Sequence, residues 1–311
     1  AGSLSDYYLQ EPLPNGERIN QGFKGNTPEA TQSAAQLVQV LSPNGWEKYE
    51  DGQGTSIDWR SSGLTQERHA ALINVGGIQE DNWLLDDYWT TSHSSTSHTN
   101  PIDITGVTNP APEAVHQAYG YAYSGVGKTM DYSLPVPDGA YTIRLHFAEP
   151  SYTSAGSRIF DVLLQGLTVQ DDFDVFGASG ARYKATTLEF PVTAAGGTGI
   201  DLSFVNETYY GAILSGIELR TPNVGGVSDP QVALDLSTDT GSIWTPLSTG
   251  ESMDVYGRGS LPWTATPQTS GNTALIRASA LNGTMPQDES DAAFLIANAG
   301  TEYYVATTGD N

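Results

Sequence analysis

Short runs of alternating apolar and polar residues, each ended by turn residues, recur along most of this chain. The clearest run is YTIRLHFAE at 141–149, in which every second side chain is apolar. Clusters of Gly, Pro, Asn and Asp separate such runs at intervals of roughly ten residues, a spacing typical of antiparallel sandwiches rather than of alternating strands and helices. The sequence therefore predicts an all-β fold. The one fair helical candidate, residues 28–41, itself alternates like a strand in its second half.

Length and charge narrow the choice of function. A chain of 311 residues exceeds the usual single domain, so two domains are expected. Its 36 Asp and Glu against 13 Lys and Arg give a net charge of −23, which repels nucleic acid and anionic lipid. No apolar stretch is long enough to enter a membrane. The absence of cysteine excludes disulfides, thiolate zinc sites and cysteine nucleophiles, a composition common in extracellular bacterial proteins.

Two separated stretches resemble the halves of one bacterial immunoglobulin-like module. Residues 38–64 contain a strand, an SPNG turn followed by Trp46, a Gly-rich turn and a strand ending at Trp59. The second half of the pattern follows only at 232–296. The resemblance implies a discontinuous immunoglobulin-like sandwich, residues 35–69 plus 223–299, interrupted by an inserted domain at 70–222.

The insert carries five ordered sequence blocks. They are LINVGG (72–77), WLLDDYW (83–89), MDYSLPVPDGAYTIRLHFAE (130–149), RIFDVLLQGLTVQDDFDV (158–175) and GAILSGIEL (211–219). In order and spacing they resemble a malectin domain, a carbohydrate-binding β-sandwich. The resemblance implies two β-sandwiches in this chain, a malectin-like jelly roll inserted into the immunoglobulin-like one.

The flanks resemble parts of parallel β-helices. Residues 6–33, with the EPLPNGERIN segment, resemble the tail of such a helix, and 302–311 resemble the first strand of another. We therefore expect residues 1–34 to be a linker and 300–311 to begin a following segment. The implied whole is a large secreted or cell-surface bacterial protein in which this chain contacts neighbouring domains.

Polar residues next to the 141–149 run raise the question of catalysis. Glu149 ends that run and Arg158 begins the next strand after a short loop, so we expect an ion pair. A glycosidase needs two carboxyl groups at a defined separation across a cleft, and nothing singles out such a pair. No G-x-S-x-G motif is present, and GGTG at 196–199 precedes a strand rather than a helix. We expect no enzyme activity.

Two further polar motifs have a structural and a functional interpretation. The DDFD motif places Asp171, Asp172 and Asp174 in a loop, where they turn the chain or hold a structural calcium ion. The HSSTSH motif places His93 and His98 in a Ser/Thr-rich segment without a third histidine nearby, so a solvated loop is expected.

Tyrosines are the best candidates for ligand contacts, because sugars lay their C–H faces on aromatic rings. Polar or Gly/Ser-rich segments hold most of them, although core packing would also explain some in AYGYAYSG. The malectin resemblance places one ligand-contacting tyrosine at Tyr121, or at Tyr119 if the register slips, and a Tyr-Phe pair at Ser151 and Tyr152. One of these two stacking rings is thus lost at Ser151, and the family's aspartate falls near Tyr209, with Asn206 and Glu207 the nearest polar residues. The resemblance therefore implies binding of a glycan without establishing a diglucoside specificity. The candidate ligand-binding residues are Tyr119, Tyr121, Tyr152, Asn206, Glu207, Tyr209 and Tyr210.

Three functions remain to be weighed. The leading one is a non-catalytic unit that binds an oligosaccharide or polysaccharide and acts as a spacer. The first alternative is a purely structural or adhesin-type spacer that binds protein or nothing, and the second is an enzyme.

Overall fold

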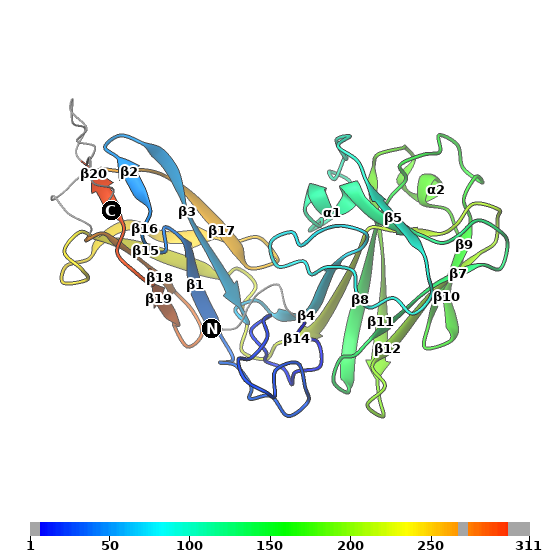
Figure 1. Ribbon diagram of the computed structural model, residues 1–311, viewed down its shortest axis with the longest axis horizontal. Coiled ribbons are helices and arrows are strands. Elements are labelled where there is room, and N and C mark those ends of the chain that lie inside the picture. The colour runs from blue at the N-terminus through cyan, green and yellow to red at the C-terminus, as the bar shows by residue number, and fades with distance from the viewer. Residues whose placement is uncertain (1–6, 267–272, 298–311) are drawn as a thin grey trace, which may run out of the picture. The chain divides into compact units, whose positions relative to one another are not determined.

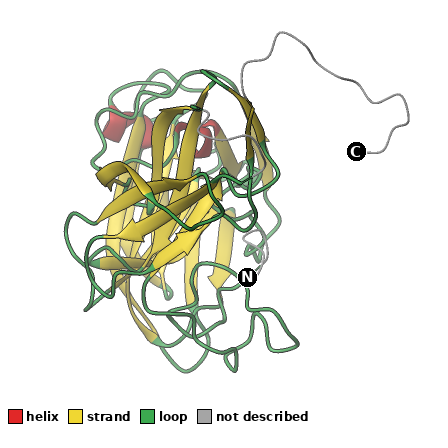
Figure 2. Ribbon diagram, turned by 90° about the vertical axis from the view of Figure 1, so that its left-hand side faces the viewer, coloured by secondary structure: helices red, strands yellow, loops and turns green. Residues whose placement is uncertain are grey.

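The computed structural model describes residues 7–266 and 273–297. The chain divides into two compact units, which are described separately (Figure 1). The first unit comprises the N-terminal residues up to Ala34 together with Glu67–Asn223. The second comprises Ala35–Gln66 and the chain after Asn223. Strands dominate both, and the helices are short (Figure 2).

Two four-stranded antiparallel sheets form the body of the first unit. Their inner faces share one hydrophobic core, the arrangement of a β-sandwich. One sheet has the order β10-β9-β12-β7 and the other β11-β8-β14-β4. Their bounds are β4 Glu67–Asn74, β7 Thr129–Leu134, β8 Gly139–Ala148, β9 Phe160–Leu164, β10 Leu167–Phe173, β11 Ala185–Ala194, β12 Ile200–Asn206 and β14 Gly216–Pro222.

Smaller elements cover the ends of this sandwich. A three-stranded sheet has the order β13-β6-β5, and two short helices accompany it. Neither helix of the described chain is long and apolar enough to cross a membrane. The bounds are β5 Ser94–Ser97, α1 Glu113–Gln117, β6 Ala118–Tyr121, α2 Val175–Ser179 and β13 Ile213–Leu214.

Strand β8 shows how the sequence pattern builds the core. Ile143, Leu145 and Phe147 are fully buried in the core, as the alternation predicts. The Phe147 ring lies 5.1 Å from that of Phe173 and 6.2 Å from that of Phe160, so both sheets meet at these aromatic rings. The all-β prediction is confirmed by these sheets.

The N-terminal segment packs into the first unit and is not a free linker. Tyr8 and Leu9 are 1% exposed and belong to the sandwich core. The buried Glu11 carboxylate accepts hydrogen bonds from the backbone N–H groups of Asn20 and Asn26, each at 2.8 Å, which fixes the irregular chain. The described part of this segment is therefore part of the first unit.

The second unit also consists of β-strands around its own core, which includes Trp59 and Phe294. Strand β3 pairs with β17, which is the pairing between residues 38–64 and 232–296 expected from the sequence. Residues 28–36 form no helix. The sheets are β1-β3-β17 (Leu37–Ser42, Gly54–Ser62, Arg258–Thr264), β16-β15-β18-β19 (Thr245–Ser252, Gln231–Ser237, Leu275–Ala280, Gln287–Glu289) and β2-β20 (Lys48–Glu50, Leu295–Ala297).

Candidate functional site

Three loops meet at one end of the first unit. Strand β12 ends at Asn206 opposite Phe160, where β9 begins, so the segment after β12 lies beside the segment before β9. The 149–159 loop enters that end from β8. Strand β6, which carries Tyr121, pairs with β13 immediately after the 207–212 loop. Antiparallel pairing therefore gathers the tyrosine-bearing segments that are separate in sequence.

The expected ion pair between Glu149 and Arg158 is confirmed, and it fixes this end of the sandwich. The Arg158 Nε atom lies 2.9 Å from Glu149 Oε2, and both side chains are buried. Glu149 Oε1 accepts the backbone N–H groups of Ser151 and Tyr152 at 2.9 and 3.0 Å. Arg158 also donates to the carbonyl of Gly211. One buried pair thus holds two of the three loops together.

Tyr152 is the ring that this pair supports directly. The Arg158 guanidinium lies 5.0 Å from the centre of the Tyr152 ring, a cation–π distance. Tyr210 lies against Tyr152 with ring centres 4.7 Å apart, and Tyr209 lies 5.6 Å from Tyr210. Tyr209 is 67% exposed and Tyr210 is 42% exposed. Tyr152, Tyr209 and Tyr210 thus form an aromatic surface that is open to solvent and is supported by the buried Glu149–Arg158 pair.

Tyr119 and Tyr121, on β6, are partly buried and pack against the sandwich core. Their ring centres are 6.0 Å apart, and Tyr119 shares a side-chain hydrogen bond with Ser151, the neighbour of Tyr152. Burial raises the pKa of both Tyr119 and Tyr152. Both hydroxyls therefore keep their protons at neutral pH and can donate a hydrogen bond to a ligand oxygen.

The two polar candidates of the 206–212 segment differ. Asn206 is fully buried, and its amide donates to the carbonyls of Tyr123 and Gly125 while its oxygen accepts the N–H of Ala212. The expectation that Asn206 contacts a ligand therefore does not hold, because every polar atom of the side chain already holds a loop. Glu207 is exposed beside the tyrosines and remains a candidate.

The acidic cluster differs from the sequence expectation by one residue. Carboxylate oxygens of Asp161, Asp171 and Asp172 lie within 4.8 Å of one another and could hold a metal ion. The charges of Asp161 and then Asp172 raise the pKa of Asp171. Asp174 is not part of this set, because its side chain caps α2 by accepting the N–H of Gly177 at 3.0 Å.

The HSSTSH segment is not a solvated loop. Residues 94–97 form strand β5, and the His93 side chain is only 5% exposed. Its Nε2 atom lies 3.3 Å from Asp86 Oδ2, and the same oxygen accepts the hydroxyl of Tyr132. His93 therefore helps to attach the edge of the small sheet to the sandwich.

Sequence reasoning missed a buried polar cluster on the outer face of β4, β8 and β14. His69 and His146 each place Nε2 near one oxygen of Glu218, at 3.1 and 3.0 Å. Burial lowers the pKa of His146. Burial alone would lower the pKa of His69 as well, but the hydrogen bond and charge of Glu218 outweigh it and raise that pKa. The cluster is a structural centre rather than an open site.

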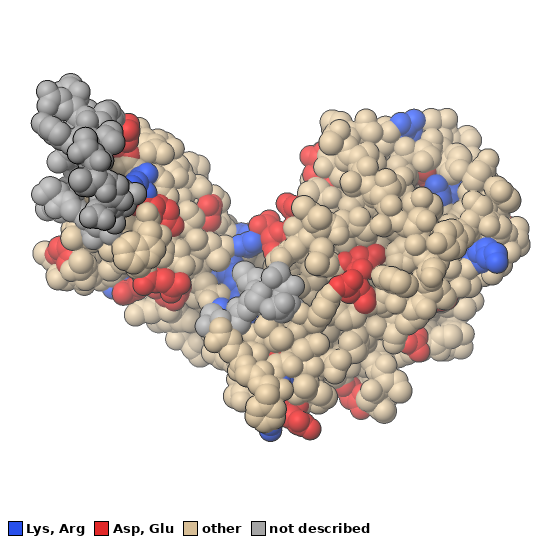
Figure 3. Space-filling model, in the orientation of Figure 1, with Lys and Arg blue, Asp and Glu red and all other residues tan. Residues whose placement is uncertain are grey.

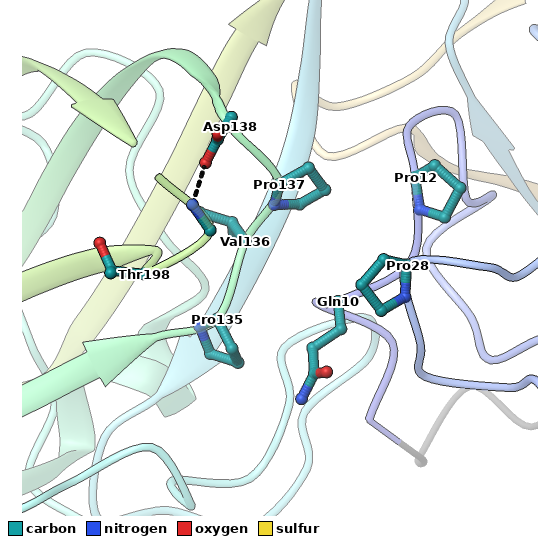
Figure 4. A pocket seen from close by; sticks show the side chains of 9 residues that line it. Gln10, Pro12, Pro28, Pro135, Val136, Pro137, Asp138 and Thr198 are labelled. Atoms are coloured by element: carbon teal, nitrogen blue, oxygen red, sulfur yellow. Dashed lines mark hydrogen bonds between the residues drawn. The ribbon is translucent and has the colours of Figure 1, made fainter. Parts of the chain in front are cut away.

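A cavity lies at the opposite end of the first unit, where the β7–β8 and β11–β12 connections cross from one sheet to the other. Its volume is about 560 Å³, and Pro12 and Pro28 line it across from Pro137 (Figure 4). The Asp138 carboxylate, in the β7–β8 connection, accepts the N–H groups of Gly196 and Gly197 and so joins it to the β11–β12 connection. Proline rings suit a sugar less well than the tyrosine end, which offers aromatic faces together with hydroxyl groups.

Comparison with known proteins identifies the first unit. A family model described as the malectin domain matches residues 72–208. A putative receptor-like protein kinase of Arabidopsis thaliana is 25% identical over 239 residues, which are 64% of this chain and 27% of that protein. Receptor-like protein 4 of the same plant is 33% identical over 129 residues, 38% of this chain and 20% of that protein. The chain thus spans about a quarter or less of these relatives.

Among solved structures, the ANX2 ectodomain from Arabidopsis thaliana matches with a TM-score of 0.44 at 20% identity, covering 52% of each chain. The family match alone shows that residues 72–208 are a malectin domain, which is a domain of carbohydrate-binding type. These relatives are plant proteins, and the comparisons give no support to the expected bacterial origin.

Proposed function

We propose that this chain is a non-catalytic glycan-binding unit, and that its malectin domain contacts an oligosaccharide or polysaccharide through the tyrosine end of the sandwich. The observation that carries the proposal is the contact of the Tyr152 and Tyr210 rings, with centres 4.7 Å apart and planes tilted by 40°, on loops fixed by the buried Glu149–Arg158 pair. The contacting rings are Tyr119, Tyr121, Tyr152, Tyr209 and Tyr210.

The chemistry of these residues suits a sugar. Pyranose rings present C–H faces to aromatic rings and hydroxyls to polar groups, and the tyrosines supply both kinds of contact. Glu207 adds an exposed acceptor at the edge of the surface. Acidic side chains form several patches on the face drawn in Figure 3, and basic ones are fewer. The resulting negative field favours neutral glycans over uronic or sulfated ones.

Binding without catalysis is part of the proposal. The Glu149 carboxylate, the buried acid nearest the rings, is held by Arg158 and by two backbone N–H groups. Both carboxylate oxygens are therefore occupied by groups of the protein, which leaves neither of them open to a substrate.

The remaining features support an extracellular role. The similar proteins are named as a receptor-like protein kinase and a receptor-like protein. We place this chain outside the cell, secreted or at the cell surface, next to other domains of a longer protein. In this proposal the second unit is an immunoglobulin-like sandwich that serves as a spacer.

A second candidate function is a spacer whose tyrosine end binds protein. The observation in its favour is Tyr209, because a 67% exposed tyrosine is also a common anchor of protein interfaces. Failure of all sugars to bind would favour this candidate.

Calorimetry with neutral gluco-, galacto- and xylo-oligosaccharides tests the proposal on the whole chain. We expect Tyr152→Ala and Tyr210→Ala each to weaken binding about tenfold, because one stacked ring contributes roughly 1 kcal/mol or more. The matched control is Phe23→Ala, which removes a 93% exposed ring from the N-terminal segment of the same unit. Equal affinity in all three variants, or no binding at millimolar sugar, would refute the proposal.

A further inference from the structure

Trp46 in the second unit adopts a backbone conformation that tryptophan rarely takes. It follows the SPNG turn between β1 and β2, with φ of 70° and an exposed fraction of 76%. Positive φ suits glycine, and for a bulky residue it is an outlier. Trp59 and Trp83, by contrast, are fully buried. Position 46 thus carries a large apolar side chain where both backbone and solvent disfavour it.

The loop around Trp46 holds this conformation firmly. The Glu47 carboxylate accepts the backbone N–H groups of Asn44 and Gly45 at 2.8 and 2.7 Å. The Asn44 side chain exchanges two hydrogen bonds with Asp291, at 3.0 and 2.8 Å. Trp46 itself donates its N–H to the carbonyl of Ala293 at 3.2 Å. The strained residue is therefore fixed by its surroundings and cannot relax by moving the loop.

The indole ring does not serve the core of its own unit. Tyr49 fills that role three residues later, with its ring 6.1 Å from that of Trp263 and 5.9 Å from that of Phe294. Trp46 is absent from this core cluster, and within the described residues its ring has no aromatic neighbour. A side chain that adds strain without adding packing is expected where function, not stability, determines the residue.

We propose that Trp46 is a second glycan contact, a stacking surface for one sugar ring of a neutral glycan whose pyranose rings carry equatorial substituents, for which cellohexaose is the probe. A flat exposed indole matches the C–H face of an equatorially substituted pyranose. Asn44 lies in the same loop and is hydrogen-bonded to Asp291 of the β19–β20 connection. The carboxylates of Glu47 and Asp291 disfavour an anionic glycan here. The site belongs to the second unit and uses none of the tyrosines. It can therefore be tested independently of glycan binding at the tyrosine end.

Cellohexaose titrated into the whole chain tests the site, read by calorimetry and by tryptophan fluorescence. We expect Trp46→Gly and Trp46→Asn to weaken binding at this site at least about tenfold, and Trp46→Tyr to restore most of it. The glucan-induced change in emission should vanish in both non-aromatic variants. Ile243→Asn, at another exposed apolar residue of the second unit, is the matched control and should change neither signal.

A melting experiment separates binding from a structural role. Glycine suits the positive φ and removes an exposed ring, so Trp46→Gly should melt no lower than the wild type and is expected to melt higher. Measuring the Trp46 variants in a Tyr152→Ala, Tyr210→Ala background isolates this site, and their effect on affinity should persist there. The proposal is overturned if cellohexaose fails to bind that background at millimolar concentration, if Trp46→Gly binds it equally well, or if Trp46→Gly lowers the melting temperature by several degrees.

Discussion

Arg158 and Glu149 form a buried ion pair, with Nε and Oε2 2.9 Å apart, at the point where two loops of the malectin domain meet. Because the carboxylate also accepts two backbone N–H groups, its loss removes more than a charge. The pair is therefore the element on which the position of Tyr152 depends.

Breaking the pair from either side should destabilise the first unit. We expect Glu149→Gln and Arg158→Met each to lower the free energy of unfolding by about 3–5 kcal/mol, because each leaves a buried charge without its partner. The double variant should lose less than the sum. Urea denaturation of all four proteins measures this coupling, and additive losses would show that the two side chains act independently.

Removing an exposed tyrosine ring should cost little stability, whereas removing a buried phenylalanine ring should cost much more. Tyr210→Ala should change the free energy of unfolding by less than about 1 kcal/mol, since its ring lies at the surface. Phe147→Ala should cost about 3–5 kcal/mol, because that ring is fully buried between both sheets. Thermal and urea denaturation check the contrast, which similar losses in both variants would contradict.

The buried histidines should make the first unit sensitive to acid. Burial lowers the pKa of His116 to about 3, and it lowers that of His146 as well. Folding therefore favours the neutral form of both side chains. Their contribution to the free energy of unfolding is complete above pH 6.5, the ordinary pKa of histidine, and is lost as the pH falls towards their lowered pKa values in the folded state. Glu218, whose pKa is lowered because the hydrogen bonds of His146 and His69 outweigh its burial, adds a loss below pH 4.5.

His69 acts in the opposite direction. Its raised pKa means that its contribution to the free energy of unfolding is present below pH 6.5 and disappears as the pH rises through its pKa in the folded state.

Because of His116 and His146, we expect the free energy of unfolding to fall from pH 6.5 towards pH 4, and we expect His116→Phe to reduce the slope of that fall. Urea denaturation at several pH values tests this, and an unchanged slope in the variant would contradict it.

Calcium should raise the melting temperature if the acidic cluster binds it. Asp161, Asp171 and Asp172 repel one another, so a hard divalent cation would relieve the repulsion as it binds. Asp171→Asn should raise the melting temperature in chelator and abolish the response to calcium, while Asp174→Asn should retain the response. Identical melting curves with millimolar calcium and with excess chelator would argue against the site.

The second unit should fold without the residues inserted into it. Val227 donates its N–H to the carbonyl of Leu64 at 2.8 Å, so the chain leaves and re-enters this unit at neighbouring points. Replacing 67–223 by a short Gly/Ser linker should leave a domain with a cooperative thermal transition. A protein without dispersed amide resonances would contradict this.

Alternation along single strands was readable from the sequence, whereas contacts across the sandwich were not. The apolar residues of 141–148 predicted the buried face of β8, and the short loop between Glu149 and Arg158 predicted their pairing. Arg144 and His146 fall on the other face, which alternation assigns to solvent. In the structure other segments of the chain bury Arg144 and His146 on that face, and the local sequence pattern does not predict this burial.

The tyrosine site was predicted in part for the same reason. Polar loops marked Tyr152, Tyr209 and Tyr210 as exposed, and the structure brings these three together. Asn206 could not be recognised as a buried loop anchor, because its partners are backbone groups of distant residues. Likewise, Asp161 joins the acidic cluster through the β9–β10 pairing rather than through adjacency in the DDFD motif.

The pairing of β3 with β17 has a consequence for the order in which the chain matures on the ribosome. Residues 54–62 emerge early and stay without this strand neighbour until residues 258–264 have been synthesised. The malectin domain between them can meanwhile complete its own sheets. Synthesis at roughly 5–20 residues per second leaves the waiting strand unpaired for about ten seconds or longer. The inserted domain thus matures first, and the unit that encloses it in sequence matures last.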